Sequence, residues 1–171
     1  MTIAIVMGVS GSGKTTIAAG LAARLGWQML EGDKLHPPAN IAKMKAGQPL
    51  DDADRAPWLA AIAAEIDRWQ AEGISALIAC SALKRAYRAV LIGARADMVL
   101  IYLRGSERLI AARLAARKGH FMPPGLLASQ FAALEEPGPD EHPLIQPIEA
   151  PPETLVAALA AKLAPPVAAR A

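Results

Sequence analysis

The sequence has very little of several features that define other classes of protein. It contains one cysteine, Cys80, so no disulfide can form within the chain, and a reducing compartment such as the cytoplasm is expected. Its aromatic content of 4% is low for a protein that stacks nucleic-acid bases on aromatic rings. No apolar run approaches the roughly 20 residues of a membrane-spanning helix, and the start lacks a signal-peptide pattern. These absences argue against disulfide scaffolds, membrane proteins and nucleic-acid binders.

Charge is also nearly balanced, because 18 basic and 16 acidic residues give a formal net charge of +2. The two signs are mixed along the sequence and form no basic tail, which again disfavours a nucleic-acid partner. A chain of 171 residues that is 53% hydrophobic can close one core and is short for two ordinary domains. We therefore expect residues 1–171 to form a single domain.

Short apolar runs alternate with longer segments rich in alanine and leucine. The runs cover residues 3–7, 27–30, 76–80, 98–103 and 144–148. Such runs are typical of strands buried on both faces. The clearest helical pattern, residues 54–72, places tryptophan and isoleucine on one face and stops at Gly73. This alternation predicts an α/β fold of three layers, with a parallel sheet of about five strands between helices.

A phosphate-binding loop follows the first expected strand directly. Its residues are Gly8-Val9-Ser10-Gly11-Ser12-Gly13-Lys14-Thr15, with Thr16 next in the expected helix. Glycines let the backbone turn its N–H groups toward phosphate oxygens, and a helix N-terminus adds further donors. In this motif the lysine reaches the β- and γ-phosphates and the hydroxyl of the last residue ligates Mg²⁺. The sequence therefore predicts a P-loop protein that binds ATP and Mg²⁺.

Two carboxylates, Glu31 and Asp33, follow the second expected strand, at the edge where open parallel sheets bind ligands. Asp33 is our candidate for the base that orients and deprotonates an attacking hydroxyl; the alternative is a helix cap. Glu31 could reach Mg²⁺ through a water molecule.

A basic segment, residues 104–118, carries Arg113 and Arg117 four residues apart, followed by a glycine- and proline-rich stretch. We expect a hinged lid whose arginines close onto the phosphates; the alternative is a solvated helix face.

Three blocks of residues carry a specific resemblance to the gluconate kinase (gluconokinase) family. The blocks are Asp33-x-x-His36-Pro37-x-x-Asn40-Ile41-x-Lys43-Met44-x-x-Gly47-x-Pro49-Leu50-x-Asp52-x-Asp54-Arg55-x-Pro57-Trp58-Leu59; Cys80-Ser81-Ala82-Leu83-Lys84-x-x-Tyr87-Arg88; and Arg117-x-Gly119-His120-Phe121-Met122-Pro123 with Ser129-Gln130-Phe131-x-x-Leu134-Glu135-x-Pro137. The resemblance spans most of the chain. One departure is Glu31, where many relatives have aspartate; another is Ile92, where many have arginine, so that any anion contact there is lost or passes to Arg95.

The resemblance implies a fold like that of nucleoside monophosphate kinases and shikimate kinase, with a substrate segment at about 33–72 and a lid at about 113–137. It implies a homodimer that converts D-gluconate and ATP to 6-phospho-D-gluconate and ADP. One carboxylate and a row of hydroxyls call for cations and mixed donors and acceptors, and we expect Arg55 and Arg88 at the carboxylate, with Lys84 as a third cation. The candidate substrate residues are Asp33, His36, Asn40, Lys43, Arg55, Ser81, Lys84, Arg88 and His120; the candidate catalytic residues are Lys14, Asp33 and Arg117.

Two other functions stay open from the sequence. One is a kinase for a different small hydroxy acid, such as shikimate. The other is a regulatory nucleotide-binding module without catalysis, since a P-loop alone does not separate these classes.

Overall fold

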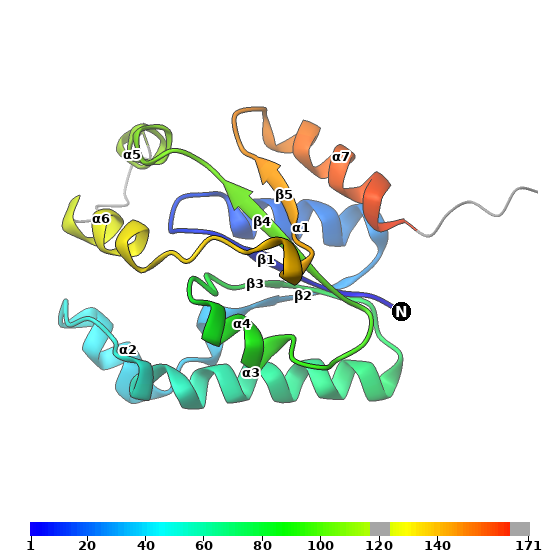
Figure 1. The fold of residues 1–171 in the computed structure, drawn as a ribbon, viewed down its shortest axis with the longest axis horizontal. Helices are drawn as coiled ribbons and strands as arrows, with labels where there is room; N and C mark the ends of the chain where they lie inside the picture. Colours follow the sequence, from blue (N-terminus) through cyan, green and yellow to red (C-terminus); the bar gives the residue numbers. More distant parts are fainter. Residues whose placement is uncertain (117–123, 165–171) are drawn as a thin grey trace, which may run out of the picture.

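Five parallel strands form the centre of the molecule, shown in a computed structural model that describes residues 1–116 and 124–164 (Figure 1). The strands are β1 (Ile3–Met7), β2 (Gln28–Glu31), β3 (Ala76–Ala79), β4 (Met98–Arg104) and β5 (Leu144–Pro147). Their order in the sheet is β2-β3-β1-β4-β5, and each neighbouring pair is parallel. The predicted sheet is confirmed, with strand ends that shift by at most one residue.

The central strand β1 explains why these runs are apolar throughout. All five of its residues are fully buried, because helices cover both faces of the sheet. Ala4 and Val6 point into one core, and Ile3, Ile5 and Met7 point into the other. The period of two along a strand thus distributes one continuous apolar run between two cores.

Helices α1 (Lys14–Leu25) and α7 (Pro152–Leu163) cover one face, and α3 (Asp52–Glu72) and α4 (Arg85–Leu91) cover the other, as Figure 1 shows above and below the sheet. The remaining helices are α2 (Pro38–Lys45), α5 (Glu107–Ala116) and α6 (Pro124–Ala133), and two 3₁₀ turns are η1 (Gly32–Leu35) and η2 (Pro139–Glu141). No helix within the two described ranges is long and apolar enough to cross a bilayer.

Helix α3 begins two residues before the predicted start because of a capping box. Asp51 accepts a hydrogen bond from the Asp54 amide at 2.8 Å, and Asp54 accepts one from the Asp51 amide at 3.1 Å. The predicted apolar face is buried, and the helix ends as expected at Gly73 in the left-handed conformation.

Parallel strands bring several predicted site residues to one edge of the sheet. The phosphate loop follows β1, Asp33 follows β2, and Ser81 follows β3. The Gly8 amide donates to the Ser81 carbonyl at 3.4 Å, which joins the ends of β1 and β3. Ligands of open parallel sheets bind at this carboxyl edge.

Candidate active site

The loop between β1 and α1 has the backbone conformation of a phosphate cradle. Gly8, Gly11 and Gly13 have φ values of +148°, +83° and +97°, in the region that favours glycine. A Cβ atom at Gly8 would come within 2.8 Å of the Ser12 Oγ and 2.9 Å of the Leu103 carbonyl oxygen. Gly13 precedes α1 without a side-chain cap, so the first N–H groups of the helix stay available for an anion.

Lys14 lies with its ammonium group over this loop, where Nζ donates to the Val9 carbonyl at 3.0 Å. Burial lowers the pKa of Lys14 below its ordinary value, while the nearby carboxylates of Asp33 and Glu31 oppose this shift. Both carboxylates at the end of β2 therefore act on the lysine of the loop, as one electrostatic cluster.

Buried polar atoms at this cluster fit a bound nucleotide and a hydrated metal ion. Ser12 Oγ and Glu31 Oε1 are buried and have no hydrogen-bond partner within the described residues. Thr15 and Thr16 expose their side chains in the first turn of α1. Across residues 1–116 and 124–164, no group of three or more His, Cys, Asp or Glu residues could hold a metal alone. Mg²⁺ suits such a place, because it keeps several waters and shares phosphate oxygens.

Asp33 lies in η1 with its carboxylate exposed to solvent and without a hydrogen bond inside the described part of the chain. Trp58 Nε1 donates to the Gly32 carbonyl at 2.8 Å, which fixes the turn that carries Asp33. The residues that precede η1 and α2 in the cap positions are Glu31 and Pro37, so the capping alternative for Asp33 is not seen. The carboxylate is therefore free to accept a hydrogen bond from a substrate hydroxyl.

His36 is held against the ring of Trp58, with centroids 4.3 Å apart and an interplanar angle of 13°. The Asn40 amide nitrogen lies 3.3 Å from His36 Nδ1 and 2.7 Å from the Asp54 carbonyl. Because an amide nitrogen only donates, Nδ1 accepts and Nε2 carries the proton. Burial lowers the pKa of His36, against the opposing charge of Asp33, so the ring is held neutral with an Nε2–H donor.

The two lysines among the candidate substrate residues each form an ion pair with a carboxylate of the protein itself. Lys43 pairs with Asp54 at 2.7 and 2.8 Å, and Lys84 pairs with Asp52 at 2.8 and 2.9 Å. Both partner carboxylates lie in the first turn of α3, which Lys43 reaches from α2 and Lys84 reaches from the residue before α4.

Tyr87 joins the second of these pairs to Arg55. Its hydroxyl donates to Asp52, and Arg55 Nη1 lies 3.4 Å from that hydroxyl and 2.5 Å from the Leu50 carbonyl. Neither Asp52 nor Tyr87 was predicted as a site residue, although both lie in the motif blocks. Lys84 and Asp52 are 32 residues apart, so only the fold reveals their pairing.

Comparisons with known proteins give the family of this chain. The AAA domain family matches residues 3–137. A gluconokinase of Gluconobacter oxydans (strain 621H) is 55% identical over 137 residues, or 80% of this chain and 77% of that protein. The chain belongs to the gluconokinase family. The thermoresistant gluconokinase of Escherichia coli (strain K12) is 46% identical over 156 residues, covering 91% and 89% of the two chains.

A solved structure extends the match to three dimensions. A gluconokinase from Sinorhizobium meliloti 1021 has a TM-score of 0.85 at 40% identity, covering 95% of this chain and 91% of that one. The predicted P-loop kinase fold and the family resemblance are both confirmed.

Arg88 of this gluconokinase-family chain has a different role from the one its motif suggested. Its side chain is 1% exposed, and its Nε and Nη2 donate to Glu141 at 2.6 and 2.9 Å. Its Nη1 donates to the carbonyls of Ala82, Leu83 and Glu135. All three nitrogens are thus used inside the protein, and the expected contact with a substrate carboxylate is replaced by a structural one. Arg95 is likewise paired, with Asp67, at 2.5 and 3.0 Å.

We expect Arg88→Met to lower the free energy of unfolding by about 3–5 kcal/mol, because it leaves the Glu141 carboxylate without its buried partner. The matched control is Arg85→Met on the same helix, whose partner Asp140 is 58% exposed, so little change is expected. Urea denaturation of both variants measures the difference. Equal stability of the two variants would contradict a structural role for Arg88.

Arg113 is the one lid arginine that the described residues include. It lies on α5 and donates to the Ile148 carbonyl just after β5. The same helix packs on the phosphate loop, since a Cβ atom at Gly11 would come within 2.8 Å of the Leu114 side chain. Arg117 and His120 lie outside the described residues.

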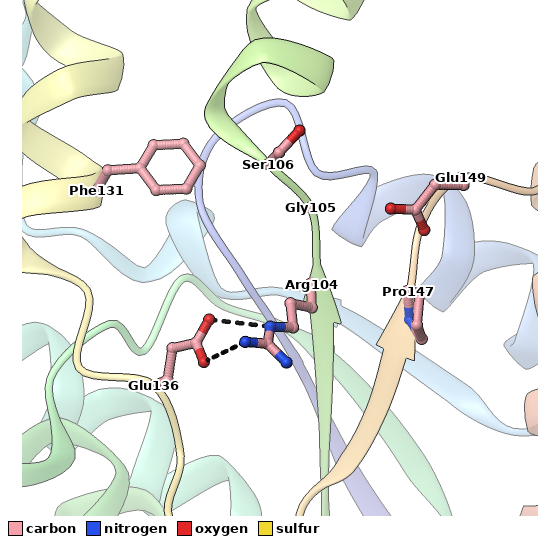
Figure 2. A pocket seen from close by; sticks show the side chains of 7 residues that line it. All are labelled: Arg104, Gly105, Ser106, Phe131, Glu136, Pro147 and Glu149. Carbon is pink, nitrogen blue, oxygen red and sulfur yellow. Dashed lines mark hydrogen bonds and ion pairs between the residues drawn. The ribbon is translucent and has the colours of Figure 1, made fainter.

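A cavity of about 490 Å³ lies at the carboxyl ends of β4 and β5 (Figure 2). Its lining residues are Arg104, Gly105, Ser106, Phe131, Glu136, Pro147 and Glu149. Arg104 Nε lies 3.2 Å from Glu136 Oε1, and Nη2 lies 3.1 Å from Oε2. None of the predicted site residues lines this cavity, so the phosphoryl-transfer site is assigned to the cluster around Lys14.

Proposed function

We propose that this chain transfers the γ-phosphoryl group of ATP to the 6-hydroxyl of D-gluconate, giving 6-phospho-D-gluconate and ADP. The observation that carries the proposal is the cluster of Lys14 and Asp33 at the carboxyl edge of the sheet, where their charges interact. One group suits the phosphates and the other suits an attacking alcohol, in a chain of the gluconokinase family.

The nucleotide side of the reaction uses residues 8–16. Backbone N–H groups of Gly11 and of residues 13–16 would surround the phosphates, and Lys14 would stabilise the charge that develops on the terminal phosphoryl group. Thr15 would hold Mg²⁺, with Glu31 reaching it through water; when bound, the metal neutralises charge on the β- and γ-oxygens. Arg113 and, by sequence, Arg117 would close on the phosphates from the lid.

The acceptor side begins with Asp33, which would accept a hydrogen bond from the 6-hydroxyl, align it with the phosphorus atom and take its proton. His36 would donate from Nε2 to another hydroxyl, and Ser81 would contact a third. Arg55 and Lys84 would face the carboxylate. Asn40 and Lys43 would act indirectly, because the Asn40 amide contacts His36 and the Lys43 ammonium group pairs with Asp54. His120 keeps its role at the hydroxyls as a sequence-based assignment.

The proposal treats residues 1–171 as one kinase domain, with the acceptor segment at about 33–72 and the lid at about 113–137. It includes a homodimer in the cytoplasm.

A coupled assay for ADP release tests the function directly. D-gluconate, close stereoisomers of it, shikimate and no acceptor are compared, each with Mg²⁺ and with excess EDTA. We expect turnover only with Mg²⁺ and highest kcat/KM with D-gluconate. A higher kcat/KM with shikimate would favour the other hydroxy-acid kinase. Slow ATP hydrolysis that no acid stimulates would favour the regulatory module.

A further inference from the structure

Helix α6 reaches the phosphate loop through one side chain. Gln130 Oε1 accepts a hydrogen bond from the Ser10 amide at 2.5 Å, across 120 residues of sequence. Gln130 belongs to one of the motif blocks, but the sequence did not predict it as a site residue. The contact joins the lid side of the molecule to the third residue of the loop.

The peptide group between Val9 and Ser10 is bound at both ends. Its carbonyl accepts from Lys14 Nζ at 3.0 Å, and its N–H donates to Gln130. Lysines in this motif reach the β- and γ-phosphates. Gln130 therefore lies at the part of the loop that serves the terminal phosphates.

The orientation of the Gln130 amide follows from the partner that it binds. A backbone N–H is only a donor, so the carbonyl oxygen of Gln130 must face Ser10, and the Nε2 group lies one carbon atom away. Within the described residues, Nε2 has no hydrogen-bond partner. A pair of N–H donors is thus left beside the phosphate loop.

Helix α6 is anchored well enough to hold this amide in place. Leu127 is buried in the core on the α1 side, and Phe131 packs against the same core one turn later. Directly after the helix, the Glu135 amide donates to the Leu83 carbonyl at 2.9 Å, and its side chain accepts from the Arg85 amide at 2.6 Å. Packing and backbone hydrogen bonds therefore fix both sides of the helix turn that carries Gln130.

From this geometry we infer that Gln130 binds the phosphoryl group that is transferred, with Oε1 on the Ser10 amide and Nε2 donating to a γ-phosphate oxygen. The inference rests on the proposed function. Donors positioned at developing charge contribute most in the transition state. Gln130 thus distinguishes ATP from ADP and acts on kcat as well as on nucleotide affinity.

The experiment compares Gln130→Glu with the unaltered chain. Glutamate keeps an oxygen for the Ser10 amide but replaces the NH₂ donor with a negative oxygen next to the phosphates. We expect kcat to fall about 100-fold and the Kd for a non-hydrolysable ATP analogue to rise about tenfold. The Kd for ADP, which lacks the γ-phosphate, should change less than about threefold. Calorimetric titrations with Mg²⁺ and the coupled assay measure these values.

Two further variants complete the test. Gln28→Glu makes the same chemical change on an exposed residue at the start of β2, the end of the strand away from the active site. This variant should behave like the unaltered chain. Gln130→Met keeps the length of the side chain without any donor or charge, and should lower kcat about tenfold. Thermal melting establishes that each variant is folded; if Gln130→Glu melts early, Gln130→Met decides.

A kcat and analogue Kd of Gln130→Glu within threefold of the unaltered chain would overturn the inference, because the Ser10 contact alone would then account for the residue. Equal weakening of ADP and analogue would overturn it too, since Gln130 would then only support the loop. The binding experiments contain no gluconate, so they decide on Gln130 even if the unaltered chain fails to phosphorylate gluconate and the proposed function falls.

Discussion

Lys14→Ala lowers kcat by about 10³-fold or more in the assay with ATP, Mg²⁺ and D-gluconate, while the chain stays folded. Phosphoryl transfer involves little covalent chemistry for the protein, so catalysis depends on positioning and on charge stabilisation. The alanine variant removes the cation closest to the Val9 carbonyl of the loop. No other ammonium group in the described chain has the Val9 carbonyl as its hydrogen-bond acceptor.

The fold should tolerate this substitution because the charged side chain of Lys14 destabilises the folded state when no nucleotide is bound. Burial lowers the pKa of its ammonium group, which means that the charged form is less stable there than in water. The loop conformation is set by the glycines at positions 8, 11 and 13, which the variant keeps. Circular dichroism and thermal melting should therefore resemble those of the unaltered chain.

Lys162→Ala is the matched control, since this lysine is exposed in the last turn of α7. It should leave kcat and KM unchanged. Near-normal turnover of Lys14→Ala would contradict the assignment of the phosphate loop, whereas a loss of folding would contradict the argument from burial.

Local patterns predicted the features that depend on neighbouring residues. The phosphate loop, the strands and the stop at Gly73 each follow from residues close together in sequence, so they could be located before the fold was known. The apolar pattern starts α3 two residues late, because the reciprocal hydrogen bonds of Asp51 and Asp54 that begin the helix precede the first residue of its apolar face.

Side-chain partners across the fold could not be predicted in the same way. Arg88 looked like a free cation in its motif, but it pairs with Glu141 from a segment 53 residues away. The role of Gln130 could not be predicted, because its partner is a backbone N–H group, which every residue type except proline has. A motif identifies which charged residues are present. Only the folded structure shows which of them already pair with another residue of the protein and which can still bind a substrate.

Asp33→Asn is expected to lower kcat by about 10²- to 10⁴-fold while the Kd for an ATP analogue changes less than about threefold. Asparagine has the same shape but cannot take a proton from the 6-hydroxyl. The turn that carries the residue should persist, because Trp58 Nε1 still donates to the Gly32 carbonyl. Steady-state kinetics and calorimetric titration with Mg²⁺ separate the two effects.

Glu153→Gln makes the same change from carboxylate to amide on an exposed residue of α7, and should keep full activity. An unchanged rate for Asp33→Asn would remove Asp33 from the role of base. If the rate and the nucleotide affinity fell together, Asp33 would act on the metal and phosphates instead. The expected result, a rate loss without an affinity loss, places the residue on the acceptor, because only the transition state then depends on its charge.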